Sequence, residues 1–173
     1  MASIVRIIGI DPGSRKTGWG VIESSGHKSQ HIAHGCLDVG DGDLPGRLLK
    51  ILRGLGEILA EYQPQEAAVE ETFVNRANPN SALVLGQARG AAICAVALAD
   101  LVVAEYAAAQ VKVAIAGNGR AEKQQVQHMV KVLLNLQQKM SADAADALAV
   151  ALTHAHVRGT RVRAGVDLNR AWG

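Results

Sequence analysis

The first part of the chain alternates between short apolar runs and turn-forming residues. Residues 4–10 (IVRIIGI), 19–24 (WGVIES) and 29–37 (SQHIAHGCL) are rich in apolar residues, many of them β-branched, and Gly and Ser separate them. Runs of this length between turn residues are typical of β-strands. The pattern predicts three consecutive antiparallel strands.

Over residues 44–63 the apolar positions follow a helical period. They recur every three or four residues, with charged residues between them, at Leu48, Leu52, Leu55, Leu59 and Tyr62. This spacing predicts an amphipathic helix, which Pro64 ends.

The rest of the chain alternates between strand and helix patterns. We predict a strand over 66–71, a polar loop, a helix capped by Ser81, a strand over 101–105, and helices over 107–114, 121–136 and 143–157. The order βββαβαβα predicts an α/β fold with a five-stranded mixed sheet flanked by helices. Right-handed crossovers would place the first and fourth strands side by side.

Length and composition indicate one soluble domain. A chain of 173 residues is long enough for one substantial core, and 49% hydrophobic with 20% charged residues is ordinary for a globular protein. Aromatic residues are only 3%, so Ala, Val, Leu and Ile must build the core. We expect this domain over residues 1–157 and a flexible basic tail, with four arginines, over 158–173.

Net charge and cysteine usage bear on the binding partners and the cellular compartment of the protein. A net charge of +2 permits a nucleic-acid partner without demonstrating one. Cys36 and Cys94 lack CxxC spacing and lie in apolar surroundings, which predicts buried, reduced thiols. The sequence has no signal-peptide pattern and no run of eighteen apolar residues, so we expect a cytoplasmic protein without a membrane segment.

Four carboxylates carry the candidate chemistry. Asp11 and Glu70 each end an apolar strand, and Asp143 and Asp146 are spaced i, i+3, which places them on one face of a helix. Acids gathered this closely would repel one another, so a divalent cation would stabilise them. Magnesium or manganese fits best.

Each acid also has a local interpretation. Asp11 could serve a turn, Glu70 could be a strand end in water, and Asp143 could favour a helix N-terminus. Asp146 is harder to explain locally, because its neighbours in ADAADALAVAL are nearly all apolar and its charge needs a partner. Taken together, the four favour a functional site.

Several motifs resemble the bacterial RuvC family of Holliday junction resolvases, within the ribonuclease H-like superfamily. They are GIDPGSRKTGWGVI, the strand ending in Glu70, LGQARG, EYAAAQVK, AEKQQVQHMV and ADAADALAVALTH, and the resemblance extends to about residue 156. It implies a ribonuclease H-like nuclease domain over residues 1–157. The catalytic and metal-binding acids of the family fall on Asp11, Glu70, Asp143 and Asp146.

The resemblance also implies a mechanism and partners. Two Mg²⁺ ions per subunit, replaceable by Mn²⁺, would flank the scissile phosphate, with Asp11 bridging them. A homodimer would nick two strands of like polarity in a four-way DNA junction, in cooperation with the branch-migration proteins RuvA and RuvB. The small stripe of Gly86, Gly90 and Cys94 would be the subunit contact or, alternatively, would pack on its own sheet.

The predicted DNA contacts are cations and one aromatic residue. Lys112 and Lys123 match motif positions of the family, and Arg120 and Lys131 are weaker candidates for phosphate contacts. Phe73 and Arg76 lie in the polar loop after Glu70, where an aromatic residue of the family helps to probe bases near the crossover. Each lysine could instead be a solvated surface residue, and Phe73 could anchor its loop in the core. His128 or His154 could act as a base, although surface or core histidines are commoner.

Three other functions compete with junction cleavage. An actin-like ATPase or sugar kinase shares the core fold, but it needs a second phosphate loop that 173 residues do not accommodate. A related nuclease could process RNA. A junction-binding protein without catalysis is disfavoured by the four acids, because a cluster of negative charge does not help to bind a polyanion.

Overall fold

The computed structural model describes residues 4–26, 28–71 and 78–165. Its elements, in chain order, are β1 (Val5–Asp11), β2 (Lys16–Ser25), β3 (Lys28–Asp38), α1 (Leu44–Tyr62), β4 (Glu66–Glu70), α2 (Pro79–Leu98), β5 (Val103–Tyr106), α3 (Ala108–Ala116), α4 (Lys123–Leu134) and α5 (Ala142–Arg163).

The five strands form one mixed sheet in the order β3-β2-β1-β4-β5. The first three strands are antiparallel neighbours, whereas β4 pairs parallel with β1 and with β5. This confirms the predicted five-stranded mixed sheet and the pairing of the first and fourth strands.

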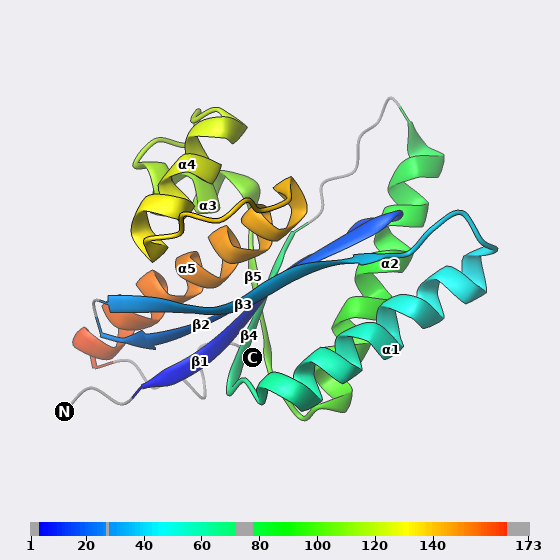
Figure 1. Cartoon of the computed structure of the whole chain (residues 1–173), viewed down its shortest axis with the longest axis horizontal. Coiled ribbons are helices and arrows are strands. Elements are labelled where there is room, and N and C mark those ends of the chain that lie inside the picture. Colours follow the sequence, from blue (N-terminus) through cyan, green and yellow to red (C-terminus); the bar gives the residue numbers. More distant parts are fainter. Residues whose placement is uncertain (1–3, 27, 72–77, 166–173) are drawn as a thin grey trace.

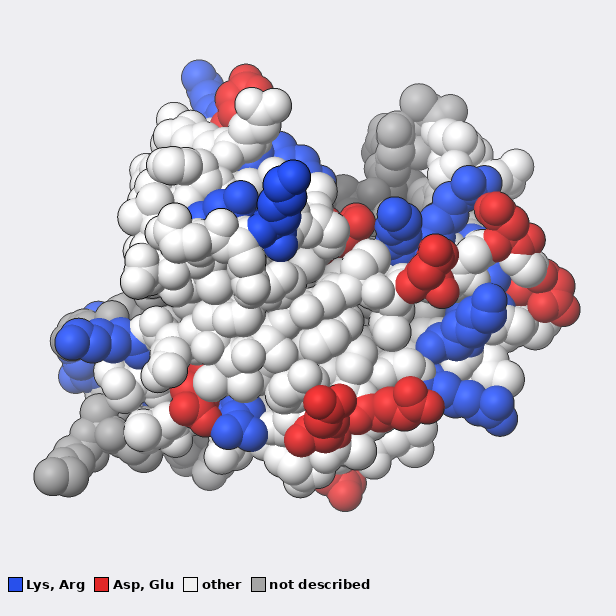
Figure 2. Space-filling model, viewed as in Figure 1, with Lys and Arg blue, Asp and Glu red and all other residues white. Residues whose placement is uncertain are grey.

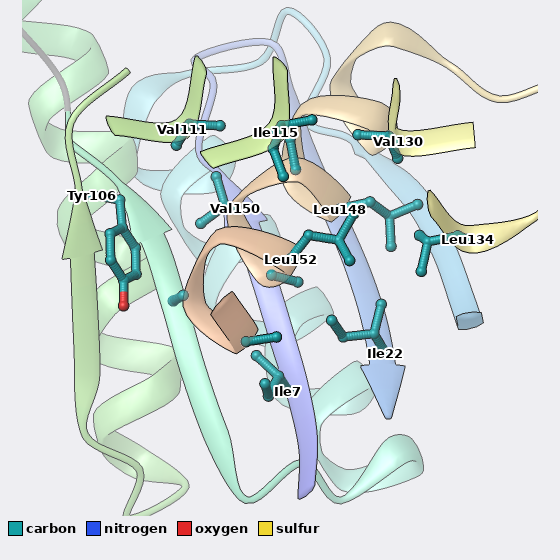
Figure 3. Packing of buried hydrophobic residues seen from close by; sticks show 14 of the residues in the cluster. Ile7, Ile22, Tyr106, Val111, Ile115, Val130, Leu134, Leu148, Val150 and Leu152 are labelled. Carbon is teal, nitrogen blue, oxygen red and sulfur yellow. The ribbon is translucent and has the colours of Figure 1, made fainter. Parts of the chain in front are cut away.

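Helices cover both faces of the sheet, which gives three layers (Figure 1). One core lies between the sheet and the pair α1 and α2, where the alternate strand residues Ile8, Ile10 and Val69 point. The other core lies beneath α5, and α3 and α4 pack over α5 there (Figure 3).

Glycines let α5 approach the sheet closely. A Cβ on Gly9 of β1 would overlap the backbone carbonyl of Ala147, and one on Gly18 of β2 would overlap that of Asp143. Two neighbouring strands therefore need a residue without a side chain at this contact. The helix is consequently held against the strand that ends in Asp11.

Two predicted boundaries differ from the structure. Helix α2 begins at Pro79, two residues before Ser81, because the Asn78 side chain accepts a hydrogen bond from Ser81 N at 3.2 Å and caps the helix. Helix α5 continues to Arg163 instead of ending at residue 157. Residues 158–163 of the predicted tail are thus helical, and residues 166–173 lie outside the described residues.

Helix α2 exposes much of its apolar surface. Its Ala88, Ala92, Ala95 and Val96 are buried against the core, but Cys94 is exposed, contrary to the prediction of a buried thiol. Gly86 and Gly90 have no atom within 4 Å of a Cβ position, so the small stripe does not pack on its own sheet.

Among the described helices, α2 alone has a length and composition that would allow it to cross a membrane. The same property is found in core helices of soluble proteins. One face of α2 packs in the core that α1 also lines, which accounts for part of its apolar composition.

Candidate metal-binding active site

Asp11 and Glu70 end two neighbouring parallel strands. The register pairs Ile10 of β1 with Val69 of β4. Asp11 and Glu70 are the next residues of these strands, so they lie side by side at one edge of the sheet. Alternation along the strands places Asp11 on the same face as Gly9, which is the face that α5 covers. The strand ends therefore direct both acids toward this helix.

Helix α5 supplies the other two acids from its first two turns. Ser141 caps the helix by accepting a hydrogen bond from Ala144 N at 3.2 Å, and Asp143 lies in the first turn. From Ala144 to Ala155, Asp146 is the only residue that is not buried. The apolar surroundings that made Asp146 conspicuous in the sequence are the packed faces of α5.

Asp11, Glu70 and Asp146 line an open cleft of about 320 Å³ between the sheet edge and helices α3 to α5. Figure 2 shows a hollow between the α3–α4 part and the α1–α2 part, with acidic atoms at its floor and basic side chains beside it. The lining residues are Asp11, Glu70, Ala108, Val111, Lys112, Lys123, Val126, Asp146 and Ala149. Asp143 is not among them, but it is close enough to Asp11 to raise the pKa of that carboxyl.

Burial and mutual repulsion make these carboxyl groups hard to ionise. Burial, followed by the charges of Glu70, Asp146 and Asp143, raises the pKa of Asp11 to about 7. Burial and the charge of Asp146 also raise the pKa of Glu70. A bound cation would offset this repulsion and stabilise the ionised carboxylates, so the cluster favours cation binding.

Lys123 supplies one positive charge to the cluster. Its Nζ lies 2.6 Å from Asp146 Oδ2, and 63% of the lysine side chain is exposed against 17% of the aspartate. This hydrogen bond raises the pKa of Lys123. Lys112 lines the same cleft and lowers the pKa of Glu70 by its charge, which opposes the effect of burial. The two lysines that match the family motifs therefore face the acids.

The donor set fits a hard divalent cation. Within the described residues, no three His, Cys, Asp or Glu side chains already converge on a single cation position. The oxygens of Asp11, Glu70 and Asp146 nevertheless line one cleft, and carboxylate oxygens are the ligands that Mg²⁺ and Mn²⁺ prefer. A cation would offset the repulsion among the acids and replace the Lys123 ammonium beside Asp146.

The other predicted site residues lie apart from the acids or outside the described residues. Phe73 and Arg76 fall outside them. Arg120 is exposed just before α4, and Lys131 and His128 line a separate depression on α4. His154 is 1% exposed and bonds to Tyr106 and Glu66, so it does not face the cleft as a base would.

Two contacts near the site went unnoticed in the sequence. The Cys36 thiol lies 3.9 Å from Asp143 Oδ2, and burial raises the pKa of this thiol. Glu66 binds His154 and Arg158 of α5. The sequence carries one signal for the contact between Glu66 and α5. Glu66 and Glu70 are four residues apart on a strand, so they must share a face.

The raised pKa of Asp11 predicts a pH-dependent stability effect in the presence of a chelator. Between the ordinary pKa of 3.8 and about 7, the folded chain holds a proton that the unfolded chain has lost, so stability falls as pH rises through this range. Asp11→Asn removes this cost. We expect it to raise the free energy of unfolding by roughly 2 to 4 kcal/mol at pH 8, with little gain at pH 4.

Urea unfolding of both proteins in EDTA at the two pH values measures this effect. A gain of equal size at both pH values would contradict the assignment to the Asp11 charge.

Comparison with known proteins identifies the family. Residues 7–154 match the family model described as crossover junction endodeoxyribonuclease RuvC. Proteins of that name from Xanthomonas campestris pv. campestris (strain B100) and Stenotrophomonas maltophilia (strain R551-3) are 55% and 56% identical over 171 and 173 residues. These matches cover 98% of this chain and 98% and 99% of the two relatives.

Solved structures share the fold. The Thermus thermophilus RuvC structure in complex with a Holliday junction substrate superimposes with a TM-score of 0.84 and 33% identity, covering 90% of this chain and 96% of that one. The yeast mitochondrial Holliday junction resolvase Ydc2 has a TM-score of 0.66 at 9% identity, covers 92% and 83% of the two chains, and thus supports the fold alone. With a matching family model, relatives of near-equal length and this ribonuclease H-like fold, the chain belongs to the RuvC family of crossover junction endodeoxyribonucleases.

Proposed function

We propose that this protein resolves Holliday junctions by metal-dependent hydrolysis of two phosphodiester bonds in homologous recombination and DNA repair. The observation that carries the proposal is the cleft in which three carboxylates, from β1, β4 and α5, face Lys112 and Lys123. Carboxylates alone would repel DNA, and lysines alone would only bind it. The combination suits a site that holds cations and a phosphate together.

Asp11, Glu70, Asp143 and Asp146 would hold two Mg²⁺ ions. Asp11 lies near the other three acids, whose charges contribute to its raised pKa. Such ions would supply activation of a water and stabilisation of the departing 3′ oxygen. Lys112 and Lys123 neutralise phosphate charge beside the acids.

A homodimer would provide the two cuts, since a two-fold symmetric pair of sites matches the symmetry of a four-way junction. The exposed apolar surface of α2 supports this contact: Leu83 is 64% exposed and Leu98 76% exposed in the single chain. Gly86 and Gly90 leave open space along the same helix, which would allow a second backbone to approach. Cooperation with RuvA and RuvB in the cytoplasm follows from the family alone.

The proposal is tested with a labelled mobile four-way junction and a linear duplex of the same sequence, each incubated in Mg²⁺. We expect paired nicks in strands of like polarity on the junction, with ends that ligase seals, and no cutting of the duplex. Binding of the junction without nicking would favour the junction-binding alternative. Equal cutting of an RNA-containing duplex would favour the RNA-processing alternative.

A further inference from the structure

A chain of hydrogen bonds links β4, β5 and α5 on the side of the sheet that carries the acids. Tyr106 Oη lies 2.9 Å from His154 Nδ1, and His154 Nε2 lies 2.8 Å from Glu66 Oε2. The other Glu66 oxygen accepts a 2.8 Å hydrogen bond from Arg158 Nε. Neither cleavage nor DNA binding as proposed uses any of these four side chains.

The linkage is buried and its polar groups complement one another. His154 is 1% exposed and Tyr106 3% exposed, whereas Glu66 and Arg158 lie at the margin. The hydrogen bonds from His154 and Arg158 outweigh burial and lower the pKa of Glu66, so it is a carboxylate that can only accept. His154 Nε2 therefore donates the hydrogen bond to Glu66, and the Tyr106 hydroxyl pairs with Nδ1 on the other side of the ring. These directional hydrogen bonds constrain the relative positions of β4, β5 and α5.

Two of the three elements that this linkage joins, β4 and α5, also carry acids of the cleft. Glu66 and Glu70 are the first and last residues of β4, and both face α5. The four residue steps from Glu66 to Glu70 span about 13 Å along the strand. The eight residue steps from Asp146 to His154 span about 12 Å along the helix. The distance from Glu66 to Glu70 along β4 therefore matches the distance from His154 to Asp146 along α5. Glu66 is bonded to His154 at one end, and Glu70 and Asp146 line the cleft at the other.

Tyr106 contacts both ends of the β4–α5 interface, through its backbone beside Glu70 and through its side chain at His154. The register places it opposite Glu70, and its carbonyl accepts a 2.8 Å hydrogen bond from Glu71 N. Its side chain points back along β5, away from Val111, toward the start of the strand (Figure 3). One residue therefore holds the backbone beside Glu70 and, through His154, the helix that carries Asp146.

We propose that Glu66, His154 and Tyr106 are positioning residues that fix the register of α5 on β4 and thereby the separation of Glu70 and Asp146. This inference rests on the proposed metal-dependent function. A sliding of α5 by one residue would move Asp146 by about 1.5 Å along the strand. Metal sites tolerate little such displacement: replacing the direct hydrogen-bond partners of metal ligands typically changes metal affinity about 10-fold to 100-fold.

The test is Mn²⁺ binding measured by isothermal titration calorimetry on the full chain without DNA. Glu66→Gln keeps the shape of the side chain but removes its charge, and Tyr106→Phe removes one hydroxyl. We expect Glu66→Gln to weaken Mn²⁺ binding about tenfold. We expect Tyr106→Phe to weaken it less, but in the same direction.

Ile51→Val supplies the control for a merely structural role, because Ile51 of α1 is 1% exposed in the core on the opposite face of the sheet. All titrations are made at a temperature at which circular dichroism shows every variant folded. The control should lower the unfolding midpoint and leave Mn²⁺ affinity unchanged.

Two results would overturn the inference, and they are distinguishable. If the wild-type chain binds Mn²⁺ and both variants bind it equally well, the linkage only stabilises the fold. If the wild-type chain binds no Mn²⁺, the proposed metal-dependent function fails and the inference fails with it. Weaker binding in both variants, with the control unchanged, supports it.

Discussion

Replacing Asp11 by asparagine should slow junction nicking about a thousandfold or more, because metal-ion stabilisation of a phosphoryl transition state is worth several kcal/mol. Asp11 is the acid whose pKa responds to all three of the others, so its loss affects the whole cluster. Junction binding should persist, since the change removes negative charge from the surface that approaches DNA. Single-turnover nicking in Mg²⁺ and a gel-shift titration in Ca²⁺ measure the two properties.

Asp100→Asn is the matched control. Asp100 is exposed between α2 and β5 with a φ of 57°, a conformation that asparagine adopts readily. The same chemical change there should leave the nicking rate unaltered. If Asp11→Asn kept a rate near that of the control, Asp11 would not be a metal ligand, and the role of the acidic cluster would have to be reassigned.

Gly18→Ala should reduce nicking about a hundredfold, the cost of misplacing a catalytic group by about 1 Å. The added Cβ would overlap the backbone carbonyl of Asp143, so the first turn of α5 must move away from β2. Overpacking of this kind should also cost about 1 to 3 kcal/mol of stability. The nicking rate and the urea midpoint of the same preparation measure both effects.

Gly56→Ala is the corresponding control, because no atom lies within 4 Å of a Cβ at Gly56. In the interior of α1, alanine should stabilise the protein by about 0.5 to 1 kcal/mol without changing the nicking rate. A Gly18→Ala protein with normal activity would mean that α5 accommodates the methyl group, and the close contact would then not position Asp143.

Much of the fold could be predicted from local patterns, because strands and amphipathic helices of this length leave a clear period in the sequence. The five strands, the helix ending before Pro64 and the pairing of the first and fourth strands are all confirmed. The errors lie at boundaries. Asn78 caps α2 in place of Ser81, and α5 extends past residue 157, where Arg158 binds Glu66 of a strand far away in the sequence.

The candidate site was predictable for a similar reason. Asp11 and Glu70 end apolar strands and Asp146 interrupts an apolar helix, so each departs from the pattern around it. The pairing of Lys123 with Asp146, the thiol of Cys36 beside Asp143 and the exposure of Cys94 had no such local signal. They depend on which surfaces the folded chain brings together.

The sequence by itself determined the order of the elements and the family to which the chain belongs, and it singled out four candidate acids, because these depend on residue type and spacing along the chain. Only the tertiary structure decided that His154 is buried against Glu66 and Tyr106 and does not face the acids. A histidine on an apolar helix is compatible with either position. The choice between them is made by the packing of α5 across β4, a contact between residues 88 positions apart.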